Sequence, residues 1–91
     1  MKLTDAKIKQ LKNAAKSRKN KLLKFLDLAK NGERISGKDF WLNIGDIADQ
    51  IKICNVILTS NFRRAANLVQ NLDTVVREDM PSCIYNFAYE Y

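Results

Sequence analysis

The sequence contains no histidine, and its 91 residues include only two cysteines, one proline and three glycines. The lack of histidine removes the most common general base and the most common metal ligand. Cys54 and Cys83 lie far apart in the chain, a spacing that fits neither a disulfide framework nor a zinc site. The shortage of proline and glycine disfavours a turn-rich β-sandwich or barrel. We therefore expect a protein that is not an enzyme and uses no metal or cofactor.

Long apolar segments are also missing. The longest run, from Ile53 to Leu58, is interrupted by Asn55 and is far shorter than a membrane span. Lysines rather than an apolar segment follow the first residues, so no signal peptide is expected. Because 46% of the residues are hydrophobic and 29% are charged, the composition is typical of a globular domain. We expect a cytoplasmic protein with reduced thiols and no membrane association.

One segment matches the spacing of a phosphate-binding loop. Gly32, Gly37 and Lys38 fit the pattern G-x-x-x-x-G-K, but Asp39 stands where magnesium binding needs Ser or Thr. The pattern also requires a preceding strand, whereas helical periodicity precedes it here. We therefore interpret the two glycines as part of a turn between helices.

Apolar residues recur at three- and four-residue spacing along most of the chain, which predicts an all-α fold. A first helix is expected to begin at Thr4 or Asp5 and to end at Asn31-Gly32. Ser36, with an acidic residue three positions later, predicts the start of a second helical segment. The sequence predicts a single domain over residues 1–91, with a basic N-terminal helix at 4–31, a core helix or helical hairpin at 36–79 and an aromatic tail at 82–91.

The sequence leaves the number of helices open. A continuous helix over 39–79 would be about 60 Å long, more than a domain of this size spans, and Thr59-Ser60-Asn61 favours a break. The tail could be a strand, or a helix that places Ile84, Phe87, Ala88 and Tyr91 on one face. We expect a small bundle of three to four helices, in which homodimerisation would bury further apolar surface. The core is expected along a stripe of Phe40, Ile44, Ile47, Ile51, Cys54, Leu58, Ala65, Leu68, Leu72 and Val75.

Positive charge is concentrated near the N-terminus. Residues 1–38 contain 12 Lys and Arg against three Asp and Glu, whereas residues 39–91 contain four against seven. Every charged residue in one 18-residue stretch is basic: Lys7, Lys9, Lys12, Lys16, Arg18, Lys19, Lys21 and Lys24. Lysines beside a phosphate backbone displace counterions, so this stretch predicts contacts with DNA or RNA that weaken with salt. Because its apolar stripe is thin, we expect this half of the helix to project as a basic arm.

Two further residues are candidates for binding. Arg63 and Arg64 would lie in the first turn of a helix that starts near Ser60, where the helix dipole disfavours cations. The leading hypothesis is a small nucleic-acid-binding accessory or regulatory factor. The alternative is a protein–protein adaptor or inhibitor of phage or plasmid origin, which docks an acidic partner through the same basic helix.

Overall fold

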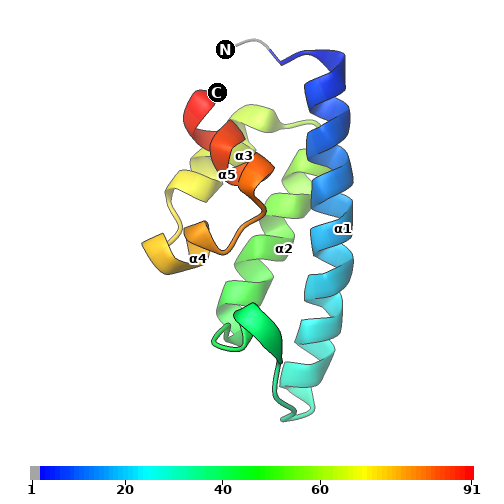
Figure 1. The fold of residues 1–91 in the computed structure, drawn as a ribbon, viewed down its shortest axis with the longest axis vertical. Helices are drawn as coiled ribbons and strands as arrows, with labels where there is room; N and C mark the ends of the chain where they lie inside the picture. The colour runs from blue at the N-terminus through cyan, green and yellow to red at the C-terminus, as the bar shows by residue number, and fades with distance from the viewer. Residues whose placement is uncertain (1–2) are drawn as a thin grey trace.

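The computed structural model describes residues 3–91, except for the side chain of Lys38. Two long helices, α1 (Asp5–Lys30) and α2 (Ile44–Leu58), form an antiparallel hairpin whose connection contains the 3-10 turn η1 (Gly37–Asp39) (Figure 1). Three shorter helices follow: α3 (Phe62–Gln70), α4 (Thr74–Glu78) and α5 (Ser82–Glu90). The α3 helix packs on α2, and α5 packs on both α1 and α3. The described chain contains no strand, and its extents are 42 × 22 × 19 Å. The prediction of an all-α protein is confirmed, with five α-helices in this part of the chain.

Both ends of α1 lie where the sequence predicts them. The Thr4 Oγ1 accepts a hydrogen bond from the Lys7 N–H at 3.2 Å and caps the first turn. At the other end Gly32 has φ +73°, and the N–H groups of Gly32 and Glu33 donate to the carbonyls of Ala29 and Leu28. This pair of bonds is a Schellman motif, which satisfies the last carbonyls of the helix and reverses the chain toward α2.

The predicted helix start at Ser36 is wrong. Ser36 precedes only η1 and makes no side-chain capping bond. The second helix begins at Ile44, where the Asn43 Oδ1 accepts from the Asp46 N–H at 2.8 Å and the Asp46 Oδ2 accepts from the Asn43 N–H at 3.3 Å. This arrangement is a complete capping box. Asp39 cannot support a cap at Ser36 because its carboxylate lies in the interior.

The break at Thr59-Ser60-Asn61 is confirmed. Thr59 ends α2, Ser60 has φ +65°, and the Asn61 Oδ1 accepts from the Arg64 N–H at the start of α3. A second break, which the sequence analysis did not predict, separates α3 from α4 over residues 71–73. Residues 36–79, expected to form one core helix or a hairpin of two, therefore contain three α-helices: α2, α3 and α4.

The aromatic tail is helical and closes the core. In α5 the residues Ile84, Phe87 and Ala88 are buried, while Tyr91 is 41% exposed. The Phe87 ring packs edge-to-face on Phe62 of α3 with ring centroids 6.2 Å apart. Full burial of side chains of this size contributes roughly 1.5–3 kcal/mol each, so the tail is an integral part of the bundle.

The first half of α1 does not project from the domain. Leu11 and Ala15 are fully buried, and α1 packs against both α2 and α5. The prediction of a free basic arm is therefore wrong. The expected core stripe also fails at Phe40, Ile44 and Val75, which are 70%, 48% and 61% exposed.

Candidate nucleic-acid interface

The buried face of α1 determines which of its basic residues face solvent. The buried positions Leu11, Ala15, Arg18, Leu22 and Phe25 recur at three- and four-residue spacing and form one face of the helix. A different flank, turned away from this face, carries basic side chains at the same spacing; we call it the lysine stripe, and it consists of Lys9, Lys12, Lys16 and Lys19. Ten residues of helix separate its ends, or about 15 Å.

The lysine stripe is open to solvent. Lys9 and Lys16 are exposed, whereas Lys12 and Lys19 are half-buried, because the stems of lysines beside a packed helix lie along the neighbouring surface. In the described part of the chain, Arg18 forms ion pairs with Asp39 and Asp79, and Lys21 forms one with Asp39. None of these ion pairs involves the lysine stripe. Four ammonium groups therefore lie on one flank of a single helix without an acidic partner among residues 3–91.

The remaining basic residues of the stretch lie elsewhere on α1. Lys7 is half-buried near the start of the helix and shares its register with the buried face. Lys21 and Lys24 are exposed on a flank that differs from the lysine stripe. The Lys21 Nζ lies 3.5 Å from the Asp39 Oδ2 and 5.7 Å from the centroid of the Phe25 ring. The structure thus brings together four of the eight predicted contacts and separates the others.

Arg18 cannot serve as a surface contact, so its prediction as a binding residue is wrong. It is only 6% exposed, and its Nη2 donates to the Asp39 Oδ1 at 3.0 Å and to the Asp79 Oδ2 at 2.7 Å. Its Nε and Nη2 also donate to the Gln50 Oε1, while the Gln50 Nε2 donates to the Asp79 Oδ2 at 3.3 Å. The helical register carries the signal that the sequence analysis missed, since position 18 falls on the same face as Leu11 and Leu22.

The two carboxyl groups around Arg18 differ in their pKa values. Burial by itself raises the pKa of each carboxyl group. For Asp39 the hydrogen bond and charge of Arg18 outweigh burial, so its pKa is lowered. For Asp79 burial and the neighbouring Asp39 carboxylate together raise the pKa above the ordinary value. When both carboxyls are ionised they balance Arg18 and Lys21, and the formal net charge of +6 then lies on the rest of the chain.

Arg63 and Arg64 lie in the first turn of α3, as predicted, and both are exposed. This turn is at the end of the molecule where α1 begins (Figure 1). The ion pairs of the described chain do not include either arginine.

The glycines of the phosphate-loop pattern and Cys54 occupy structural positions rather than a reactive site. Gly32 and Gly37 have φ values of +73° and +83° in the connection between α1 and α2, so the glycines of the phosphate-loop pattern belong to a turn between helices, as predicted. Cys54 is fully buried, and burial raises the pKa of its thiol to about 11. Within residues 3–91, no helix has both the length and the apolar character that a membrane crossing requires.

Comparisons with known protein families, with curated proteins and with solved structures find no match to this chain.

Proposed function

We propose that the protein is a non-catalytic nucleic-acid-binding factor, with an accessory or regulatory role, that contacts the phosphate backbone through the lysine stripe. The observation that carries this proposal is the placement of four lysines, none of them ion-paired within residues 3–91, on successive turns of one flank of a helix whose adjoining face is buried in the core. A length of about 15 Å corresponds to about four nucleotides at the 3.4 Å rise of one strand. The stripe can therefore approach several consecutive phosphates.

The chemistry of the stripe favours binding that does not depend on sequence. Lysine is a strongly hydrated point charge, whereas the planar guanidinium of arginine is better suited to bidentate reading of bases. The one arginine of this stretch, Arg18, is buried. If all four lysines contact phosphates, the slope of log K against log salt should be about −3.6 on duplex DNA and about −2.8 on a single strand.

The proposal is tested by fluorescence anisotropy with labelled duplex DNA, single-stranded DNA and RNA at about 50 and about 200 mM salt. The variant Lys12→Gln/Lys16→Gln removes two charges from the middle of the stripe and keeps good helix formers. The charge-matched control is Lys24→Gln/Lys52→Gln, which changes two exposed lysines outside the stripe. We expect the stripe variant to weaken binding and to make the slope shallower by about 1.4 to 1.8, with a smaller change in the control.

Two results would overturn this assignment. Equal effects of the two variants would show that net charge alone attracts the nucleic acid. Failure of the wild-type protein to bind any of the three probes at the lower salt would favour the alternative, an adaptor or inhibitor that docks an acidic protein. The exposed Leu23, which continues the register of the stripe beyond Lys19, would then supply an apolar contact for such a partner.

A further inference from the structure

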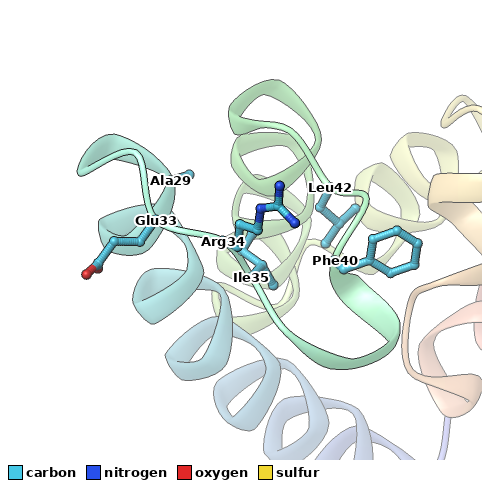
Figure 2. Close-up of a pocket in the computed structure, with 6 residues that line it drawn as sticks. All are labelled: Ala29, Glu33, Arg34, Ile35, Phe40 and Leu42. Atoms are coloured by element: carbon cyan, nitrogen blue, oxygen red, sulfur yellow. The ribbon is translucent and has the colours of Figure 1, made fainter.

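An open pocket of about 450 Å³ lies at the end of the hairpin, where the chain passes from α1 to α2. Its lining residues are Ala29, Glu33, Arg34, Ile35, Phe40 and Leu42 (Figure 2). Ile35 and Leu42 are buried and contribute apolar surface, whereas Arg34 and Phe40 are exposed. The pocket therefore combines an apolar base with a cation and an aromatic ring that are both accessible.

Phe40 is exposed because its neighbour is buried. Asp39 is drawn into the interior by Arg18, and the Phe40 side chain, at 70% exposure, is the most exposed large apolar residue of the described chain. The turn that carries the ring is anchored by the buried Arg18–Asp39 ion pair and by a hydrogen bond from the Phe40 N–H to the Gly37 carbonyl. The ring is thus presented to solvent on a fixed support, which is the arrangement that a stacking platform requires.

Arg34 supplies a positive charge at the same pocket. Figure 2 shows its guanidinium near Leu42, while the Glu33 side chain points away from it. The ion pairs formed within residues 3–91 do not include Arg34. A guanidinium without a carboxylate partner can bind the two oxygens of a phosphate in a bidentate arrangement.

We infer that this pocket binds one unpaired nucleotide of a single-stranded nucleic acid, with its base stacked on Phe40 and its phosphate on Arg34. The inference rests on the proposed function and narrows its ligand from nucleic acid in general to single strands. Every base has a face that can stack on an aromatic ring. Bases inside a duplex are already stacked on each other, so they cannot stack on Phe40.

Of the residues that line the pocket, Ala29 belongs to α1, and it shares the register of the buried Leu22 and Phe25 rather than that of the lysine stripe. Lys30, the residue after Ala29, is exposed and lies on the flank of the lysine stripe. Between Lys19 and Lys30, this flank carries one acidic residue, Asp27. Lys19 and Lys30 are separated by about 16 Å of helix, or about five nucleotides. A single strand bound along the stripe would have to cross the end of the hairpin beyond Lys30 to reach the pocket, because Lys21, which pairs with Asp39 beside Phe40, lies on another flank of α1.

The test compares an oligothymidine of about 12 nucleotides with a duplex of the same length. Phe40→Leu removes the aromatic face and keeps an apolar side chain, while Phe40→Tyr keeps the ring. Phe40→Leu should weaken single-strand binding by about fivefold to a hundredfold and leave duplex binding unchanged, and Phe40→Tyr should restore the wild-type affinity. Quenching of Trp41, the one tryptophan of the chain, by oligothymidine should be lost in Phe40→Leu in parallel.

The outcomes separate this inference from the proposed function. If Lys12→Gln/Lys16→Gln weakens binding of both probes and Phe40→Leu changes neither, the lysine stripe binds nucleic acid and the pocket inference is wrong. Equal losses on duplex and single strand in Phe40→Leu would also overturn the inference, since stacking on an unpaired base cannot act on a duplex. If the wild-type protein binds neither probe, both proposals fail.

Discussion

A charged side chain on the apolar face of a helix needs partners inside the protein, because an unpaired buried charge is strongly unfavourable. Arg18 finds them on three segments that are distant in sequence. Asp39 belongs to η1, Gln50 to α2, and Asp79 to the turn between α4 and α5. The guanidinium therefore fixes the position of two loops relative to the hairpin, and it does so by directed hydrogen bonds rather than by apolar contact.

Replacement of Arg18 by Met should be among the most destabilising substitutions in the chain. The change leaves the carboxyl groups of Asp39 and Asp79 buried beside each other without their cation, and the loss of one partner of a buried ion pair costs about 3–5 kcal/mol of unfolding free energy. Urea unfolding followed by circular dichroism measures the loss. Lys24→Met, at an exposed position of the same helix, is the control. A cost of Arg18→Met that is no greater than that of the control would show that the ion pairs contribute little.

At the scale of the helices, several boundaries were predicted from capping residues that lie close together in the sequence. Thr4, the Asn31-Gly32 pair and the Asn61 cap are all contained in a few consecutive positions, and each marks a true boundary of a helix. Ser36 fails because Asp39, its expected capping partner, has a stronger tertiary interaction with Arg18. The Asn43–Asp46 capping box is just as local and was still missed, so local capping patterns identify candidate helix ends, and the rest of the fold decides which of them are used.

The candidate binding site follows the same division. The concentration of lysine is visible in the sequence, and four of the lysines do share one flank of α1. Counting charges along the chain, however, treats Arg18 as equivalent to its neighbours, although the helical register places it inside the bundle. The pocket around Arg34 and Phe40 could not be predicted, because it exists only once the burial of Asp39 holds η1 against the hairpin.

The capping box at the start of α2 gives a prediction at this scale. Asn43→Ala removes the acceptor for the Asp46 N–H and should lower the unfolding free energy by about 0.5–2 kcal/mol, the usual cost of losing an N-cap. Ser36→Ala is the matched control, since the Ser36 side chain makes no capping bond. Urea unfolding of both variants measures the difference. Equal costs for the two substitutions would mean that the Asn43 box does not determine where α2 begins.

On the scale of the whole molecule, the cluster of Arg18, Asp39, Gln50 and Asp79 joins the hairpin to the C-terminal helices. The contributions of its two carboxyl groups to the stability of the fold change with pH in opposite directions. The lowered pKa of Asp39 contributes stability above its ordinary value of 3.8, and this contribution is lost as the pH falls through the folded pKa. The raised pKa of Asp79 means that folding favours its protonated form, so its contribution is complete below pH 3.8 and is lost as the pH rises through the folded pKa.

Asp79→Asn should therefore change how the stability of the whole domain depends on pH. Asparagine can still accept a hydrogen bond from Arg18, but it cannot ionise beside Asp39. We expect the unfolding free energy of Asp79→Asn, relative to the wild type, to increase as the pH rises from about 4 to about 7, because only the wild type must ionise a second buried carboxyl group. Urea unfolding at several pH values measures this difference, and Asp49→Asn, which removes an exposed carboxylate from α2, measures the effect of net charge alone. A difference that stays constant or shrinks over this range would show that folding does not raise the pKa of Asp79.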